Sequence, residues 1–337
     1  MNWYLTSGKD SDVVLSSRIR IARNLKDISF NLKSNEKDYE QVMNLIEKAL
    51  ENMKLKTKLI RLKDIDDLTK MSLVEKHLVS PDFVLNKNEI GAIALNDEEN
   101  ICIMLNEEDH LRIQVLSSGF DLTSNLNLAY EIEEELSKKL NYAFSSKYGF
   151  LTSCPTNVGT GLRISVMVHL PAITATGNIQ KILEIVNDFG MNIRGIYGEG
   201  TQSRGNVYQI SNKTTLGLTE EEINKNLSII TEKIIEQERL ARKYLTKNSI
   251  ELEDEVYRSY GILSNAKKIS SEECNRLLSD IRLGVDLGII DLTDLKVNKL
   301  ELYTKPANLQ QYLGQVLDEY ERDIARAKVI KDIIAED

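Results

Sequence analysis

Polar and apolar residues alternate along several short stretches in the first two thirds of the chain, and this period of two predicts β-strands. The clearest stretch is 161–170, where five apolar residues occupy one face of the predicted strand: Leu162, Ile164, Val166, Val168 and Leu170. Strands are also predicted at 12–24, 110–116 and 206–212, and short apolar runs predict two more at 90–95 and 101–105. A polar break between 95 and 101 predicts that two of these strands form a hairpin.

Apolar residues spaced three or four apart predict helices at 37–53, 122–140 and 179–189. A capping-box pattern at Thr219–Glu222 opens a predicted helix of about 26 residues, and a second such pattern lies at Ser270–Glu273. A last helix is predicted over 306–334, with one apolar face: Leu309, Leu313, Val316, Leu317, Tyr320 and Ile324. The glycine-rich segment 194–205 is expected to be a mobile loop.

These elements predict an α+β fold in two domains, an antiparallel sheet flanked by helices at 1–250 and an all-helical domain at 251–337. The length of 337 residues agrees with such a division. Lys and Arg number 43 against 52 Asp and Glu, and the resulting net charge of −9 disfavours non-specific nucleic-acid binding.

The cysteine and histidine content narrows the class further. Cys102, Cys154 and Cys274 form no CxxC pair, which favours a reducing cytoplasmic location. The start of the chain lacks the features of a signal peptide, and no run of 18 apolar residues predicts a membrane span. The three histidines are scattered, so a metal site built by the protein is not expected.

Five arginines lie on or beside the predicted strands, opposite apolar neighbours: Arg18, Arg20, Arg112, Arg163 and Arg194. Arg18 and Arg20 are two residues apart, so they project from the same face of one strand. Guanidinium groups gathered on one surface repel one another unless an anion lies between them, and their planar donors suit phosphate oxygens. The set therefore indicates a polyanionic ligand, although any single arginine taken alone more often forms an ordinary surface ion pair.

Carboxylates lie near these arginines in sequence, at Glu107–Asp109 and at Glu199. A carboxylate can hold a guanidinium group and accept its proton, but three acids in a turn also suit a solvated hairpin. Cys154 fits either a reactive or an inert thiol. A Walker-type phosphate loop, a GxGxxG motif after a strand and a GxSxG motif are all lacking, which disfavours the enzyme classes that use them.

Four segments resemble the catalytic domain of the phosphagen (guanidino) kinases in order and spacing: 16–20, 106–112, 154–163 and 194–199. The block Cys154–Arg163, with the sequence CPTNVGTGLR, is specific by itself, and the resemblance covers about residues 10–250. The resemblance implies the phosphagen-kinase fold and implies ATP and Mg²⁺ as cofactors, with the metal held by the nucleotide and water.

The resemblance also implies roles for single residues. It assigns the five arginines to the ATP phosphates and His77 to the adenine side. It places further motif residues at the nucleotide: Ser16, Ser17, Ile19, Ile164, Ser165, Val166, Met167, Gly195, Ile196, Tyr197, Gly198 and Glu199. Glu108 resembles the carboxylate that orients the guanidinium group and takes its proton, with Glu199 as its partner. Cys154 resembles a thiol that positions the guanidinium group without covalent chemistry.

Two departures from the small-molecule members bear on the substrate. Those members carry a helical domain before the segment that begins here at residue 16, so we expect an open site that admits a protein side chain. Near the C-terminus, Arg322, Asp323, Arg326 and Ala327 form a hexapeptide, RDIARA, that places two cations and one carboxylate on one helical turn. It resembles the phosphoarginine-binding motif of bacterial protein-arginine kinases, but the pattern also suits an ordinary helix surface.

We therefore interpret the chain as an ATP-dependent protein-arginine kinase that transfers the γ-phosphoryl group to arginine side chains of proteins. The resemblance further implies a stress-response role that marks proteins for a Clp-type protease, an activating zinc-containing partner protein, and a homodimer or higher oligomer. Two alternatives remain: a kinase for a free small guanidino metabolite, and a non-catalytic phosphoarginine-binding adaptor. A nucleic-acid-binding regulator is disfavoured because the helical tail has no basic stripe.

Overall fold

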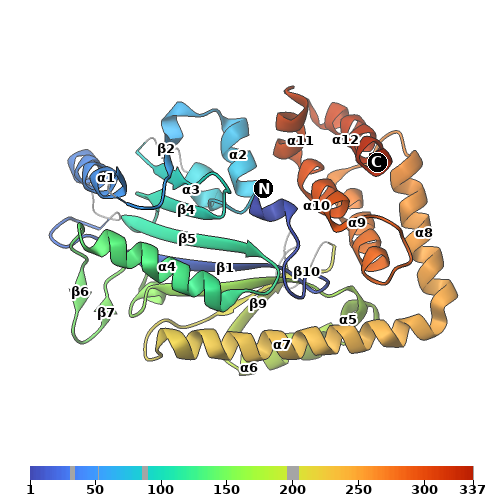
Figure 1. The fold of residues 1–337 in the computed structure, drawn as a ribbon, viewed down its shortest axis with the longest axis horizontal. Coiled ribbons are helices and arrows are strands. Elements are labelled where there is room, and N and C mark those ends of the chain that lie inside the picture. Colours follow the sequence, from blue (N-terminus) through green and yellow to red (C-terminus); the bar gives the residue numbers. More distant parts are fainter. Residues whose placement is uncertain (31–34, 52, 86–89, 196–204, 337) are drawn as a thin grey trace.

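One antiparallel sheet organises the first two thirds of the chain (Figure 1). The computed structural model describes residues 1–30, 35–51, 53–85, 90–195 and 205–336. Within them, eight strands pair in the order β2-β3-β4-β5-β1-β8-β10-β9. Their bounds are β1 (Val14–Arg23), β2 (Lys58–Arg61), β3 (Ala92–Leu95), β4 (Ile101–Leu105), β5 (Leu111–Ser118), β8 (Leu162–His169), β9 (Met191–Gly195) and β10 (Val207–Asn212). A separate hairpin joins β6 (Phe144–Ser145) to β7 (Gly149–Phe150).

Helices cover one face of this sheet and enclose the main hydrophobic core. The helices that contribute buried residues to this core are α1 (Glu36–Glu51), α4 (Leu122–Ser137), α5 (Pro171–Ala175), α6 (Ile179–Asp188) and α7 (Glu220–Leu245). The strands contribute their apolar face, which includes Ile19, Ile21 and Ile164, all fully buried. Burial of these side chains supplies most of the driving force for folding and fixes which strand face remains for function.

The opposite face of the sheet is covered only in part. The short helices α2 (Asp67–Glu75) and α3 (Pro81–Leu85) pack over its β3–β5 side in a second, smaller core. The central strands β1 and β8 carry their polar residues on this face, as the alternation in the sequence predicted. The predicted hairpin is confirmed by β3 and β4, and the predicted capping box is present at the start of the 26-residue helix α7.

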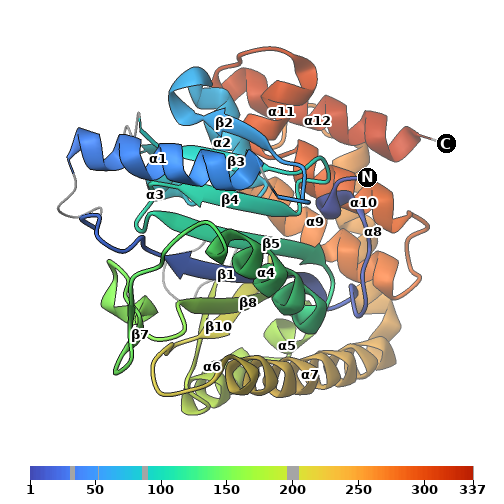
Figure 2. The same ribbon diagram turned by 60° about the vertical axis from the view of Figure 1, so that its left-hand side comes forward.

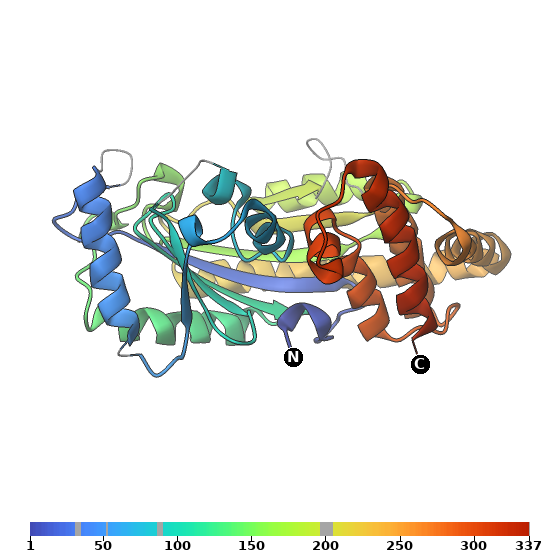
Figure 3. The same ribbon diagram turned by 90° about the horizontal axis from the view of Figure 1, so that it is seen from above.

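Five helices follow and build a core of their own: α8 (Ser249–Asn265), α9 (Ser271–Asp286), α10 (Asp294–Tyr303), α11 (Pro306–Leu313) and α12 (Glu319–Ala335). Figures 2 and 3 show them at one end of the sheet, beside the N-terminal segment and α2. The contact with α2 is specific, because both carboxylate oxygens of Glu75 accept backbone N–H groups at the start of α11, from Ala307 and Asn308, at 2.8 Å each.

The single helix predicted over 306–334 is wrong. Gly314 ends α11 with a φ of 65°, a left-handed conformation that suits glycine, and a capping box at Asp318 then starts α12. The residues that link α11 to α12, and the first turn of α12, therefore do not lie on the expected apolar face. Val316 is 86% exposed and Tyr320 is 61% exposed, so both lie in solvent.

A second correction concerns Arg194, which was expected to open a loop. It lies on β9, where its register partner on β10 is Gln209. The sequence did not predict β9, because only Met191 and Ile193 alternate there with polar residues. An alternating stretch of this length cannot be told from the end of the preceding helical pattern. Among the described residues, no helix is long and apolar enough to cross a membrane.

Candidate active site

Cationic side chains share one face of the central strands. Arg20 on β1 lies opposite Arg163 on β8, and Ala22, two residues along, lies opposite Arg112 on β5. Arg194 joins them from the edge strand β9. Because side chains at i and i+2 point to the same side of a strand, this register brings arginines from four strands to one surface.

This surface is hollowed into a cavity of about 480 Å³. Four arginines line it, Arg20, Arg112, Arg163 and Arg194, together with the carboxylate of Glu108 and the thiol of Cys154. Arg18 is the next residue on this face of β1, two positions before Arg20. It lies close enough to Arg194 and Arg112 for their charges to act on it. Burial, followed by these two charges, lowers the pKa of Arg18 to about 10.

Arg20 is held in an unfavourable environment. Burial lowers its pKa well below the ordinary value, and the neighbouring charges of Arg18, Arg112 and Arg163 lower it further. Its Nε atom is buried without a hydrogen-bond partner among the described residues. An unsatisfied, charged donor inside a cluster of like charge costs free energy, which a bound polyanion would remove.

The other arginines are oriented by defined contacts. The guanidinium group of Arg163 donates to Asn157 Oδ1 at 3.3 Å, Thr156 Oγ1 at 2.9 Å and the backbone oxygen of Asn212 at 2.9 Å. Arg112 is held by an ion pair with Glu107 at 2.7 Å. The donors are therefore fixed in direction before a ligand arrives, which reduces the entropy that binding would otherwise cost.

Glu107 and Glu108 are neighbours in sequence, but their surroundings differ. The side chain of Glu107 is only 8% exposed and accepts hydrogen bonds from both Arg112 and Ser80. The side chain of Glu108 is 41% exposed, lines the cavity and makes a longer contact of 3.3 Å to Arg112. Glu108 is thus the carboxylate of this pair that can meet a substrate in the cavity.

Asp109 joins the two loops that carry Glu108 and Cys154. Its fully buried carboxylate accepts the backbone N–H of Ser153 at 2.6 Å and the side-chain amide of Asn24 at 2.7 Å. From its sequence alone, Asp109 is one acid of a polar turn and has no predicted role of its own. The only signal in the sequence for a role of Asp109 is its position directly after Glu108 in a run of three acids. Such a run does not show which of the three side chains is buried.

Cys154 lies beside the cationic cluster. Its Sγ atom is 3.1 Å from Thr156 Oγ1, and the residue lines the cavity together with Arg163. The other two cysteines are buried, and burial raises the pKa of Cys102 to about 12 and that of Cys274 to about 11. Cys154 is therefore the thiol that a ligand in the cavity would encounter.

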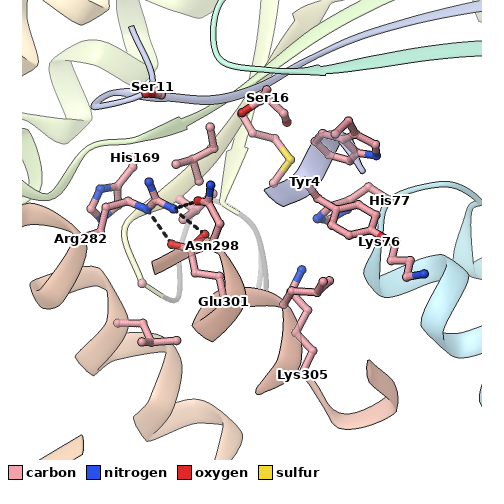
Figure 4. Close-up of a pocket in the computed structure, with 18 of the residues that line it drawn as sticks. Tyr4, Ser11, Ser16, Lys76, His77, His169, Arg282, Asn298, Glu301 and Lys305 are labelled. Atoms are coloured by element: carbon pink, nitrogen blue, oxygen red, sulfur yellow. Dashed lines mark hydrogen bonds and ion pairs between the residues drawn. The ribbon is translucent and has the colours of Figure 1, made fainter. Parts of the chain in front are cut away.

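The remaining predicted nucleotide residues divide into three groups. Ser165 faces the arginines and accepts from Arg18 Nε at 3.3 Å, whereas Ser16, His77 and Met167 line a second cavity farther along the same sheet face (Figure 4). Four more side chains point away from the arginines, into the opposite core or its edge: Ser17, Ile19, Ile164 and Val166. Only their backbone atoms face the strands of the site, and their assignment to the nucleotide stays a prediction. Gly195 ends β9, and Ile196, Tyr197, Gly198 and Glu199 lie outside the described residues.

The C-terminal hexapeptide is built into helix α12. Arg326 is 1% exposed and donates to Asp323 Oδ1 at 2.6 Å and to the backbone oxygens of Thr304 and Ile269. Ala327 is buried in the core of the C-terminal helices. Arg322 is half-buried and donates to the backbone oxygen of Leu317 at 3.3 Å. Among the described residues of the chain, no group of three or more His, Cys, Asp or Glu is arranged to hold a metal ion.

Comparisons with known proteins bear on this geometry. Residues 41–241 match the family model "ATP:guanido phosphotransferase, C-terminal catalytic domain", and residues 249–337 match "Protein-arginine kinase McsB C-terminal domain". The chain is 48% identical to a protein-arginine kinase of Bacillus pumilus, over 98% of this chain and 92% of the relative. It is 47% identical to a protein-arginine kinase of Bacillus licheniformis over the same shares of both chains.

Solved structures give the same fold. A duplicated taurocyamine kinase from Schistosoma mansoni, with bound transition-state-analogue components, aligns with a TM-score of 0.62 and 28% identity. This alignment covers 69% of the present chain and 34% of the duplicated one, so the chain spans about a third of that protein. A lombricine kinase aligns with a TM-score of 0.59 and 26% identity, over 69% of this chain and 68% of the other.

Proposed function

This chain belongs to the protein-arginine kinase family, and from that premise we propose how the described cavity carries out phosphoryl transfer. Membership makes it a phosphotransferase that acts on the guanidino group of arginine. We propose that Arg20, Arg112, Arg163 and Arg194 bind the triphosphate of ATP, with Arg18 at the adjoining position. Glu108 then presents the acceptor guanidinium group to the γ-phosphoryl group.

The observation that carries this proposal is the composition of the 480 Å³ cavity, which combines four arginines with one exposed carboxylate and one thiol. The buried, unpartnered Nε atom of Arg20 supports an anionic occupant, since the described protein supplies no acceptor for it. Planar guanidinium donors match phosphate oxygens in geometry as well as in charge.

The acceptor needs a base. A guanidinium group is protonated at neutral pH and its nitrogen lone pairs are delocalised, so it attacks phosphorus only after losing a proton. Glu108 can hold the planar group by a bidentate contact and accept that proton, while the arginines stabilise the charge that spreads over the transferring phosphoryl group. Loss of the base should lower the rate by roughly 10²–10⁴. We propose a positioning role for Cys154 beside the acceptor, and Glu199 stays a predicted partner of Glu108.

Mg²⁺ accompanies ATP in this proposal. When bound with the nucleotide, the ion would neutralise part of the phosphate charge, which is the chemistry it supplies in phosphoryl transfer. As the resemblance implies, the ion would be held through the nucleotide and water rather than by a set of protein carboxylates.

Wider roles rest on family membership. We propose that phosphoarginine binds at Arg322, Asp323, Arg326 and Ala327, that modified proteins are passed to a Clp-type protease, and that an activator protein and self-association regulate the enzyme. We place these events in the cytoplasm, where ATP is available. The burial of Arg326 means that Arg322, which is only half-buried, is the cation of this motif better placed to meet a ligand.

The test is incubation of the protein with Mg-ATP and an unfolded acceptor protein, followed by mass spectrometry under non-acidic conditions that preserve P–N bonds. We expect phosphate on arginine nitrogen. Phosphate on Ser, Thr or Tyr oxygen would contradict the proposal. Free arginine, supplied in parallel, should be phosphorylated more slowly than arginine in the protein, and the reverse would favour a metabolite kinase.

A further inference from the structure

Arg23, the last residue of β1, is a buried arginine that the proposed transfer does not use. It lies an odd number of positions after Arg18 and Arg20, so its side chain points to the other face of the sheet, which α4 covers. The side chain is only 1% exposed. A buried charge is costly unless its partners are well placed, so the contacts of Arg23 show what it holds together.

The guanidinium group of Arg23 joins three separate parts of the chain. Its Nε atom donates to Glu133 Oε1 of α4 at 3.0 Å, and a terminal nitrogen donates to the backbone oxygen of Thr160 at 2.9 Å. Its central carbon lies 3.4 Å from the centroid of the Phe150 ring. An aromatic ring attracts a guanidinium group most strongly where water is excluded. Arg23 therefore holds both Phe150 and Thr160 at the end of β1.

Phe150 and Thr160 flank one loop, which comprises residues 151–158. Phe150 and Gly159 exchange two backbone hydrogen bonds, at 2.8 and 3.2 Å, and these close the loop at its base. Gly161 follows with a φ of 66°, and a Cβ atom there would lie 2.6 Å from a terminal nitrogen of Arg23. Glycine at this position thus leaves room for the arginine, and the base of the loop is built around it.

This loop carries part of the candidate active site. Cys154, Thr156 and Asn157 all line the 480 Å³ cavity. Thr156 and Asn157 also accept hydrogen bonds from the guanidinium group of Arg163, at 2.9 and 3.3 Å, and so set its direction. Pro155 and Thr156 at the tip are exposed, so core packing does not fix them and the contacts at the base of the loop matter.

We propose that Arg23 is a positioning residue for phosphoryl transfer. From behind the sheet it fixes the base of loop 151–158, and thereby the places of the Cys154 thiol and the Arg163 guanidinium group in the cavity. The inference rests on the proposed function, since it takes this cavity as the site of transfer. Displacements of about 1 Å in such a site can lower a rate about 100-fold, so Arg23 affects turnover without touching ATP or the acceptor.

The experiment compares Arg23→Lys with a matched control, Arg242→Lys. Arg242 of α7 is a buried arginine with similar contacts, because its Nε donates to Glu238 at 2.9 Å and a terminal nitrogen donates to the backbone oxygen of Asp12 at 2.7 Å. Lysine keeps the charge in both variants but cannot reproduce the planar fork of donors. We therefore expect both variants to lower the Tm, and to a similar extent.

Two measurements on the folded, full-length protein separate positioning from stability. Arg23→Lys should lower kcat for an unfolded protein substrate about tenfold or more, whereas Arg242→Lys should keep the wild-type kcat. Iodoacetamide should alkylate Cys154 several-fold faster in Arg23→Lys alone, because its loop is released, and the other two cysteines are buried. Equal kcat values and equal alkylation rates in the two variants would overturn the inference.

Phe150→Leu provides a second test if Arg23→Lys does not fold. It removes the ring on the loop side of Arg23 and leaves the ion pair with Glu133 in place. We expect the same changes in kcat and in Cys154 alkylation, and wild-type values of both would overturn the inference. Failure of the wild type to form phosphoarginine would overturn the proposed function, while the alkylation rates would still show whether Arg23 holds the loop.

Discussion

The carboxylate of Asp109 accepts the backbone N–H of Ser153 at 2.6 Å and thereby ties the loop of Glu108 to the loop of Cys154. The two residues are 44 positions apart, yet this bond sets the relative position of the carboxylate and the thiol that line one cavity. Phosphoryl transfer relies on positioning, so a contact of this kind affects the rate without touching the substrate.

Asp109→Ala should therefore impair turnover more than binding. The change leaves the Ser153 N–H and the Asn24 amide without acceptors in a buried site and lets the two loops move apart. We expect kcat to fall about 10²-fold with little change in the KM for ATP, because displacements near 1 Å have effects of this order. Asp121→Ala, which removes the cap of α4, serves as control and should cost about 1 kcal/mol of stability without lowering kcat. Equal kcat values for the two variants would contradict the positioning role.

Arg20→Met should stabilise the protein in the absence of nucleotide. Because its folded pKa lies well below the ordinary value, charged Arg20 opposes folding at every pH below that pKa. Removal of this charge and of its unpartnered Nε should raise the stability by about 1 kcal/mol or more, seen as a higher Tm, while the stabilisation by ATP is lost. Arg239→Met removes an arginine paired with Asp10 and Asp12 and should not raise the Tm. A lower Tm for Arg20→Met would refute the argument.

The three histidines should not titrate near their ordinary pKa of 6.5. Burial lowers the pKa of His110 and lowers those of His77 and His169 well below that value. A proton-induced shift of any of the three ring signals near pH 6.5 in NMR spectra of the folded protein would contradict this. His110 is neutral because its Nδ1 accepts from Leu25 N–H while its Nε2 donates to Ser29 O.

The stability that His110 supplies should depend on pH in one direction. Below about pH 6.5 the unfolded chain binds a proton that the folded chain excludes, so this contribution is complete above that pH and is lost as the pH falls. The stability advantage of the wild type over His110→Gln should shrink by up to about 1.4 kcal/mol per pH unit. Burial raises the pKa of Asp286 to about 7, so the stability contribution of this group increases as the pH falls, opposite to that of His110. The measurement is therefore the difference in unfolding free energy between the wild type and His110→Gln at each pH.

Arg326→Met should strongly destabilise the C-terminal helices. It leaves the buried Asp323 without its partner and two backbone oxygens without a donor. We expect a loss of about 3–5 kcal/mol in denaturant unfolding, whereas Arg322→Ala on the half-exposed turn should change stability by about 0.5 kcal/mol or less. Similar losses for both variants would show that Arg326 is not the internal anchor of this motif.

The sequence predicted the central strands and their polar face well, since alternation at β1 and β8 directly encodes burial. It also predicted the capping box of α7, because that signal lies within four consecutive residues. It failed at Gly314, where one left-handed residue divides a continuous apolar pattern into two helices. The burial of Asp109 and Arg326, and the wall that α9 and α10 add beside Ser16, depend on contacts between distant segments and carry no local signal.

The central claim is that Glu108 acts on the acceptor while the arginines bind ATP. The most direct measurement is single-turnover phosphorylation of a protein substrate by Glu108→Gln and Glu107→Gln, with ATP affinity measured in parallel by calorimetry. We expect Glu108→Gln to bind ATP as the wild type does and to transfer phosphate roughly 10²–10⁴ times more slowly. Glu107→Gln should instead weaken ATP binding, because it loosens Arg112. Transfer at the wild-type rate by Glu108→Gln would contradict the account.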